Sequence, residues 1–190
     1  MKELVSRIED EGVYLGGGII KVDGFLNHQI DPHLMQTIGR EFGQMFAAAN
    51  PSRIMTSESS GIAPALATGM VLGVPVIYAR KRTPLTMSGQ VFRADAPSRT
   101  KGGFVSLMVS PDYLGPADRV LIIDDFLATG LTLLAMIDIV EQSGGAVVGI
   151  GCVIEKVFET GRSQVSHRYS GPIISLAKVN IIDGQLAVSD

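Results

Sequence analysis

The sequence has very little cysteine: Cys152 is the single one among 190 residues, so no intramolecular disulfide can form. Cys152 lies within the apolar run 147–154, which is typical of a buried small side chain rather than a reactive thiol. A chain of this length without disulfides needs a substantial hydrophobic core, and it is long enough to build one α/β domain. The cysteine content fits the reducing cytoplasm, which is the expected location.

Long runs of one residue kind are also missing. The 16 basic residues form no long run and the formal net charge is −3, which argues against binding to nucleic acid through phosphate neutralisation. Residues 1–12 are charged and lack the apolar core of a signal peptide. Residues 59–79 carry no charge, but glycines and prolines interrupt them, so they favour a loop, a short helix and a buried strand over a membrane span.

The most informative stretch is residues 120–132, which read V-L-I-I-D-D-F-L-A-T-G-L-T. Residues 120–123 have the composition of a buried parallel strand, and Asp124 and Asp125 stand where this strand is expected to end. Small and hydroxyl residues follow. An amphipathic helix then begins and ends before Gly144-Gly145.

This arrangement has a definite chemistry. A tight loop at a helix N-terminus offers backbone N–H groups and the positive end of the helix dipole to a phosphate. Thr129 and Thr132 can add hydroxyl donors. Two adjacent carboxylates would repel a phosphate, so they suit sugar hydroxyls, a divalent metal or a developing positive charge. The pattern therefore fits a ribose 5-phosphate, although an ordinary strand-to-helix turn with two solvated acids has the same local sequence.

Other polar residues also follow predicted strands. The strand 53–57 is followed by E-S-S-G (residues 58–61) and a helix over 62–72, which is a second possible anion-binding loop. The strand 76–79 is followed by Arg80-Lys81-Arg82, and the strand 146–154 by Glu155-Lys156. Strands and helices alternate from residue 53 to 154, which predicts a parallel sheet whose carboxyl ends carry the ligand. Each feature taken alone is equally compatible with a plain turn or solvated cations.

The remaining segments are less regular. Residues 1–11 and 32–48 are expected to be helical, residues 13–22 to form a short strand, and residues 21–32 a loop. The polar segment 83–103 is too long for an ordinary connection, so we expect a lid or a β-ribbon, followed by a strand over 104–110. Residues 157–169 are expected to be helical, and two last strands, 172–179 and 181–188, flank the Asp183-Gly184 turn.

The stretch 120–132 resembles the signature of the type I phosphoribosyltransferase family. The resemblance implies an α/β fold with a central, mostly parallel sheet flanked by helices, a small hood and a flexible lid loop. It implies that phosphoribosyl diphosphate (PRPP) is bound, with Mg²⁺ carried mainly by its diphosphate and no metal site of the protein's own. Asp124 and Asp125 would hold the ribose hydroxyls, and Lys81 would stabilise the diphosphate. The PRPP-binding residues would be Ala128, Thr129, Gly130, Leu131 and Thr132, with Ser59, Ser60, Gly61 and Arg80.

One departure from the family pattern narrows the substrate. Hypoxanthine-guanine members resemble E-D-x-x-D-T-G, whereas Ala128 replaces the third acid here, which resembles the adenine and xanthine branches. The segments K-V-D-x-F-L-N-H-Q-I-D-P, E-S-S-G-I-A-P-A and G-I-G-x-V-I-E-K resemble the branch that acts on xanthine. That branch implies transfer of 5-phosphoribosyl from PRPP to N9 of xanthine, with Ile20, Asn27 and Lys156 at the base. Ala128 cannot act as a general base, and the sequence identifies no other.

The resemblance also implies an organisation and an assembly. Residues 1–35 and about 156–190 would form a hood over the base, and residues 53–154 the core that binds PRPP. A homodimer is expected, with Arg80 and Lys81 near the subunit boundary, from where Lys81 could reach the neighbouring site. Three alternatives stay open: a guanine or hypoxanthine enzyme, a PRPP-sensing regulator of transcription, and a small-molecule-binding domain without catalysis. The second would need a basic recognition helix, which residues 1–52 do not offer.

Overall fold

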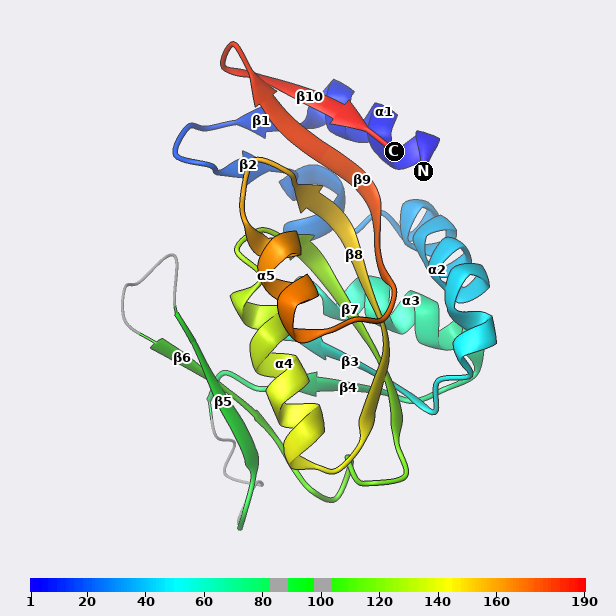
Figure 1. Ribbon diagram of the computed structural model, residues 1–190. Helices are drawn as coiled ribbons and strands as arrows, with labels where there is room; N and C mark the ends of the chain where they lie inside the picture. The colour runs from blue at the N-terminus through cyan, green and yellow to red at the C-terminus, as the bar shows by residue number, and fades with distance from the viewer. Residues whose placement is uncertain (83–88, 98–103) are drawn as a thin grey trace.

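The computed structural model describes residues 1–82, 89–97 and 104–190. They form a twisted central sheet with helices on both faces and a separate two-stranded ribbon (Figure 1). In chain order the elements are α1 Lys2–Glu11, β1 Val13–Tyr14, β2 Ile20–Lys21, a π-helical turn Asp23–Asn27, α2 Pro32–Phe46, a 3₁₀ turn Ala47–Ala49, β3 Arg53–Ser57, α3 Ile62–Leu72, β4 Val76–Ala79, β5 Phe92–Pro97, β6 Phe104–Val109, β7 Arg119–Leu127, α4 Leu131–Gln142, β8 Ala146–Lys156, α5 Gly161–Arg168, β9 Ile173–Ile182 and β10 Gln185–Ser189.

The central sheet has the strand order β10-β9-β8-β7-β3-β4. All neighbouring strands are parallel except β10, which pairs antiparallel with β9 through the Asp183-Gly184 turn. The expected α/β class with a mostly parallel sheet is therefore confirmed. Because β3, β7 and β8 run in the same direction, their carboxyl ends and the loops that follow them lie at one edge of the sheet.

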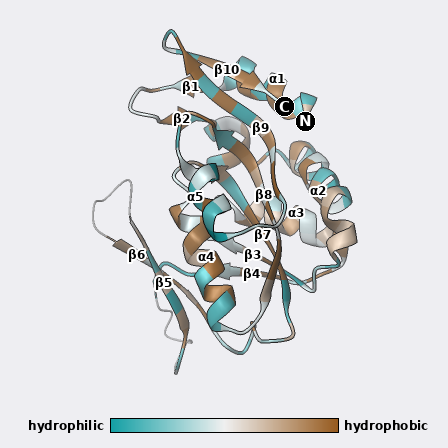
Figure 2. Cartoon of the chain, viewed as in Figure 1, coloured by the Kyte–Doolittle hydropathy of each residue, from teal (hydrophilic) through white to brown (hydrophobic). Residues whose placement is uncertain are grey.

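Two hydrophobic cores lie on opposite faces of this sheet, as the alternation of side chains along β7 shows. Val120 and Ile122 are fully buried in the core under α4, whereas Leu121 and Ile123 are fully buried in the core under α2. Apolar residues recur along the strands of the central sheet (Figure 2). Burial on both faces explains the uninterrupted apolar run of residues 120–123 in β7.

The two ends of the chain lie together at one end of the molecule, where α1 and the β1–β2 hairpin lie beside β9 and β10 (Figure 1). The N-terminal ammonium donates to the carbonyl of Leu176 at 2.7 Å. The single strand expected over 13–22 is wrong: Gly16, Gly17 and Gly18 all have positive φ and turn this segment into a hairpin. Among the described residues, no helix combines the length and hydrophobicity that crossing a membrane requires.

Two other elements have ends that differ from the sequence expectation. Strand β7 continues through Asp124 and Asp125 to Leu127, because it pairs with β8 as far as Glu155. Helix α5 begins only at Gly161, after a turn. Residues 92–97 and 104–109 pair as an antiparallel β-ribbon. Much of the expected lid, residues 83–88 and 98–103, lies outside the described residues.

Candidate active site

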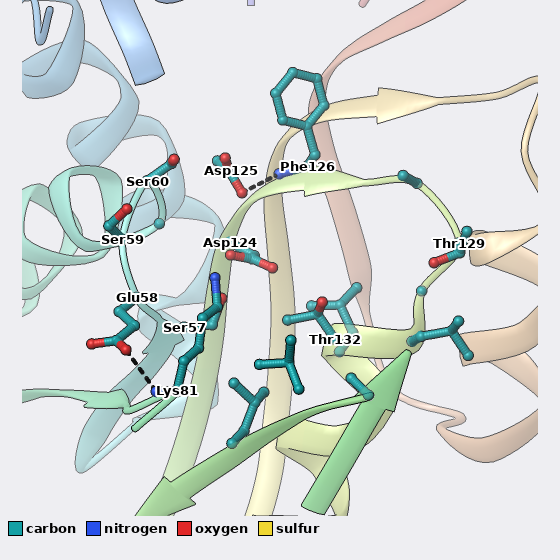
Figure 3. Close-up of a pocket in the computed structure, with 18 of the residues that line it drawn as sticks. Ser57, Glu58, Ser59, Ser60, Lys81, Asp124, Asp125, Phe126, Thr129 and Thr132 are labelled. Carbon is teal, nitrogen blue, oxygen red and sulfur yellow. Dashed lines mark hydrogen bonds between the residues drawn. The ribbon is translucent and has the colours of Figure 1, made fainter. Parts of the chain in front are cut away.

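A cleft of about 1230 Å³ opens at the carboxyl ends of β3, β7 and β8. Its walls are the loops that follow these strands, the hairpin tip with Gly17 and Gly18, and the β5–β6 ribbon. Figure 3 shows the acids of β7 between the 57–60 loop on one side and the 129–132 loop on the other. Segments far apart in sequence thus meet around one space.

The loop of residues 128–132 joins β7 to α4 and lines the cleft. Gly130 is the N-cap of α4 and has φ +79°, a conformation that glycine adopts without strain. The carbonyl of Ala128 accepts a hydrogen bond from the N–H of Gly161 at 3.0 Å. A side chain on Gly130 would lie 2.8 Å from the carbonyl oxygen of Gly161, so the loop rests directly on the first residue of α5.

The second loop, residues 58–61, joins β3 to α3 and faces the first across the acids. A Cβ on Gly61 would lie 2.2 Å from Oγ1 of Thr56 and 2.7 Å from Oδ1 of Asp124, so only glycine fits there. Glu58 holds the arm that follows β4: it accepts from the backbone N–H of Lys81 at 2.6 Å and forms an ion pair with Arg80, with Nε and Oε2 2.9 Å apart.

Asp124 and Asp125 occupy the middle of the cleft. Asp124 is 3% exposed, and its Oδ1 has no hydrogen-bond partner among the described residues. Burial, and then the neighbouring charge of Asp125, raise the pKa of Asp124 well above its ordinary value, although the positive charge of Lys81 opposes this. Burial also raises the pKa of Asp125, whose Oδ1 accepts from the N–H of Phe126 at 2.9 Å. Among the described residues, the positive charge of Lys81 compensates this pair of acids only in part.

The other end of the cleft has a different character. Ile20 is buried at the cleft wall, and Asn27 lies in the π-helical turn nearby. Lys156, the last residue of β8, donates from Nζ to the carbonyl of Gly18 at 2.7 Å. Its Nζ also lies 5.1 Å from the centre of the Phe126 ring. This end therefore offers an apolar surface, an aromatic ring, an amide and an ammonium.

The geometry has a clear chemical meaning. A glycine loop at a helix N-terminus suits a phosphate, and buried carboxylates with unused oxygens suit hydroxyl groups or a developing positive charge. An ammonium beside an aromatic ring suits a flat heterocycle with oxygen acceptors. All three parts line one continuous cleft.

Comparison with known proteins agrees with this geometry. Residues 33–180 match the family described as "Phosphoribosyl transferase domain". The chain belongs to the phosphoribosyltransferase family. In this phosphoribosyltransferase, the β7 motif with its two acids and the A-T-G loop is the stretch that resembles the family signature.

Curated relatives are similar over nearly the full chain. A xanthine phosphoribosyltransferase of Deinococcus deserti is 50% identical over 183 residues, covering 96% of this chain and 94% of the relative. One of Limosilactobacillus fermentum is 47% identical over 188 residues, covering 98% and 96%.

Among solved structures, adenine phosphoribosyltransferase of Rhodothermus marinus aligns with a TM-score of 0.75 at 24% identity, covering 94% and 99% of the two chains. That of Trypanosoma brucei aligns with a TM-score of 0.76 at 20% identity, covering 92% of this chain and 79% of the other. At these identities the likeness concerns the type I phosphoribosyltransferase fold.

The structure brings most of the residues that the sequence singled out into one cleft. Its lining includes Ile20, Asn27, Ser59, Ser60, Gly61, Lys81, Asp124, Asp125, Ala128, Thr129, Gly130, Leu131, Thr132 and Lys156. Figure 3 shows the Lys81 side chain extending toward Asp124 of the same chain. Arg80 does not line the described cleft; its guanidinium lies over the ring of Tyr78, 5.6 Å from the ring centre.

Several residues of the site were missed by the sequence interpretation. Phe126 and Gly18 position Lys156, and Gly161 supports the 128–132 loop. Arg93 and Ser106 of the β-ribbon also line the cleft. The run Gly16-Gly17-Gly18 is the one local signal that could have indicated a close backbone approach. The other contacts join residues that are distant in sequence.

Proposed function

We propose that this enzyme transfers the 5-phosphoribosyl group from PRPP to N9 of xanthine, giving xanthosine 5′-monophosphate and diphosphate. The observation that carries this proposal is that one cleft is lined by the Gly130 loop, by Asp124 and Asp125, and by Lys156 beside Phe126. These three parts match the 5-phosphate, the ribose and the purine of the product. The reaction is a step of purine salvage.

The two loops would hold the two phosphate ends of PRPP. In this proposal residues 128–132 bind the 5-phosphate, with hydroxyl donors from Thr129 and Thr132. Ser59, Ser60 and Gly61 bind the diphosphate, and Lys81 balances its charge. Arg80 contributes less directly, because its guanidinium is engaged by Glu58 and Tyr78. Backbone N–H groups at the starts of α3 and α4 support both assignments.

The acids would act on the ribose. Glycosidic cleavage gives the ribose a positive, oxocarbenium-like character while negative charge leaves on the diphosphate. Asp124 and Asp125, placed between the two loops, stabilise that positive charge and accept hydrogen bonds from the ribose hydroxyls. Both acids line the cleft, where such donors would meet their carboxylates.

Mg²⁺ fits this donor set as a partner of PRPP. Mg²⁺ prefers oxygen ligands and is commonly held by one or two carboxylates together with substrate phosphates. Asp124 and Asp125 supply such carboxylates beside the proposed diphosphate loop. When bound, the ion supplies charge neutralisation for the leaving diphosphate. Most of its ligands would come from the diphosphate and water.

The base is proposed from the chemistry of Lys156 and Asn27 and from the names of the relatives. A lysine ammonium only donates hydrogen bonds, so it suits the 6-oxo group of xanthine and opposes the 6-amino group of adenine. Guanine and hypoxanthine also carry a 6-oxo group, so selection among the oxo purines falls to the C2 edge. Asn27, with a donor and an acceptor, is proposed to read that edge or N7.

The surroundings of the base complete the proposal. Residues 1–35 and the segment from about 156 to 190 are proposed to form the hood over the base, while residues 53–154 bind PRPP. A cytoplasmic location is proposed for this salvage step, in keeping with the single buried Cys152.

A homodimer is the proposed assembly. Met70 of α3 is 78% exposed, and Leu66 of α3 and Tyr78 of the edge strand β4 are also exposed, which leaves an apolar surface beside the Arg80–Lys81 arm. A second copy would cover this surface. Light scattering should give a dimer for the unmodified chain and a monomer for Met70→Asp. A fully active monomeric wild type would exclude the assembly.

One parallel assay tests the proposed reaction. The protein is incubated with PRPP and Mg²⁺ and with xanthine, guanine, hypoxanthine or adenine, and nucleotides are measured by mass spectrometry. We expect xanthosine monophosphate as the main product, with Asp124→Asn as an inactive control. If the main product came from guanine or hypoxanthine, that base would be the substrate in place of xanthine, and the proposed reaction class would be unchanged. No nucleotide from any base, with PRPP still bound, would instead favour a PRPP sensor.

A further inference from the structure

An ion pair at the end of β8 joins a buried carboxylate to a partly exposed guanidinium. The Glu155 side chain is 4% exposed and the Arg162 side chain 39%, and both carboxylate oxygens of Glu155 accept from the guanidinium, one of them from Nε at 2.6 Å. Ser175 on β9 donates to the same carboxylate at 2.7 Å. Burial raises the pKa of the Glu155 carboxyl, but the bonds from Arg162 and Ser175 outweigh this and lower it below its ordinary value.

Arg162 is the second residue of α5, so this pair fixes the start of that helix. A further guanidinium nitrogen donates to the carbonyl of Ile173 at 3.1 Å, which ties the same turn to β9. The first residue, Gly161, carries the loop of residues 128–132: its N–H donates to Ala128, and a Cβ there would lie 2.1 Å from that carbonyl oxygen. The position of this loop therefore depends on where α5 begins.

Glu155 also connects to the base end of the cleft. Its neighbour Lys156 carries the ammonium beside Gly18 and Phe126, and successive side chains of a strand point to opposite faces of the sheet. Glu155 pairs in register with Leu127, the residue just before the 128–132 loop. Glu155 thus contacts α5 through its side chain, while its backbone pairs with Leu127 and is joined to Lys156.

We propose that Glu155 and Arg162 are positioning residues of the active site, which hold the 128–132 loop and Lys156 at the separation that one nucleotide spans. This inference rests on the proposed function, because it takes the loop as the phosphate site and Lys156 as the base reader. Neither Glu155 nor Arg162 lines the cleft. They act through Gly161 on one side and through the end of β8 on the other.

The chemistry of the pair favours positioning over stability. The Glu155 carboxylate is buried, so removal of Arg162 alone would leave a costly unpaired charge, whereas removal of both charges need not lower stability. The planar guanidinium bound to both carboxylate oxygens fixes direction as well as distance, which an apolar contact would not. Arg168, at the other end of α5, pairs with Glu141 on the surface and offers a matched comparison.

The experiment uses ribose 5-phosphate, which carries the phosphate and the sugar but neither base nor diphosphate. Its affinity is measured by calorimetry for wild type, Arg162→Lys, the double variant Glu155→Gln/Arg162→Met, and Arg168→Met. The double variant removes both charges and so leaves the local net charge unchanged. We expect the dissociation constant to rise about tenfold or more in Arg162→Lys and in the double variant. Arg168→Met should bind as wild type does.

The outcomes separate the alternatives. Weaker binding by a double variant whose Tm stays within a few degrees of wild type supports positioning, and kcat/KM for PRPP should fall with it. Unchanged affinity in the double variant would show that the pair only stabilises the fold and would overturn the inference. If the double variant does not fold, Arg162→Lys, which keeps the charge, decides in the same way. Absence of binding by wild type would refute the proposed phosphate loop itself.

Discussion

The native carboxylate of Asp124 is expected to destabilise the folded, ligand-free protein, and the variant Asp124→Asn tests this directly. Its carboxylate is almost completely buried, and Oδ1 has no hydrogen-bond partner among the described residues. The backbone of Gly61 closes that side: a Cβ there would already lie 2.7 Å from Oδ1. Burial and the charge of Asp125 raise the pKa of Asp124, which means that the folded state disfavours its ionised form.

The substitution keeps the shape of the side chain and removes its charge. A buried group without its partner costs about 1–3 kcal/mol, and more when charged. Asp124→Asn should therefore raise the free energy of unfolding by about 1–3 kcal/mol and Tm by roughly 2–12 °C for a chain of this size. The same change should lower kcat by about 10²- to 10³-fold, because the positive charge developing on the ribose loses a carboxylate.

The pH dependence gives the sharper test. The pKa of Asp124 is higher in the folded state than the unfolded value of about 3.9. Between these two pKa values the folded protein therefore binds more protons than the unfolded chain does. The stability of wild type therefore falls as pH rises through that window, and the advantage of Asp124→Asn grows over the same range. Calorimetric Tm values from pH 4 to pH 8 measure it.

A control and a refutation complete this test. Asp125→Asn should gain less, because the Asp125 carboxylate accepts a hydrogen bond from Phe126 at 2.9 Å. A variant Asp124→Asn that is less stable than wild type at neutral pH would refute the reasoning. So would a difference in Tm that stays constant across the pH range.

Two further predictions concern the ends of the cleft. Lys156→Ala should lower kcat/KM for xanthine by roughly 30- to 1,000-fold, with much less effect on PRPP affinity, because a charged hydrogen bond to the base is lost. Normal turnover of xanthine by this variant would mean that another residue reads the 6-oxo group. Gly130→Ala should weaken PRPP binding because its side chain would meet the carbonyl of Gly161 at 2.8 Å, so the loop has to move. Unchanged PRPP affinity by calorimetry, in a folded variant, would show that this loop is not the phosphate site.

Sequence reasoning located elements best where local signals mark both ends. Strand β3, helix α3 and strand β4 have the expected bounds. In this region Gly73 takes φ +69° after the last turn of α3, and Pro75 precedes β4. Each boundary there depends on residues within a few positions of it, and such signals can be read without knowing the fold.

Boundaries set by distant contacts could not be predicted in this way. The length of β7 depends on its pairing with β8, where Leu127 is opposite Glu155. The start of α5 has no side-chain cap and depends on the bond from Gly161 to Ala128, more than thirty positions away along the chain. Local periodicity contains neither contact, so the predicted strand was too short and the predicted helix too long.

The candidate site shows the same division. Groups that line the cleft stand next to strand ends, so the sequence indicates them once a parallel sheet is expected. Residues that support those groups, such as Phe126, Gly161 and Arg162, are ordinary in their local sequence. Their roles exist only through contacts across the fold, which is why the sequence interpretation did not single them out.

The helix N-termini explain why two anionic ends fit this cleft. Helix α2 supplies its own cap: Asp31 accepts from the N–H groups of His33 at 2.9 Å and Leu34 at 3.2 Å. Helices α3 and α4 have glycines as their N-cap residues, Gly61 and Gly130, and no side chain among the described residues caps them. Both glycines line the cleft. A helix start that lacks a cap of its own leaves N–H groups for a ligand. Helices α1 and α5 also lack a side-chain cap, but their N-cap residues, Met1 and Thr160, do not line the cleft. The two phosphate ends of PRPP would cap α3 and α4, so the ligand should complete the two uncapped helix termini that face the cleft.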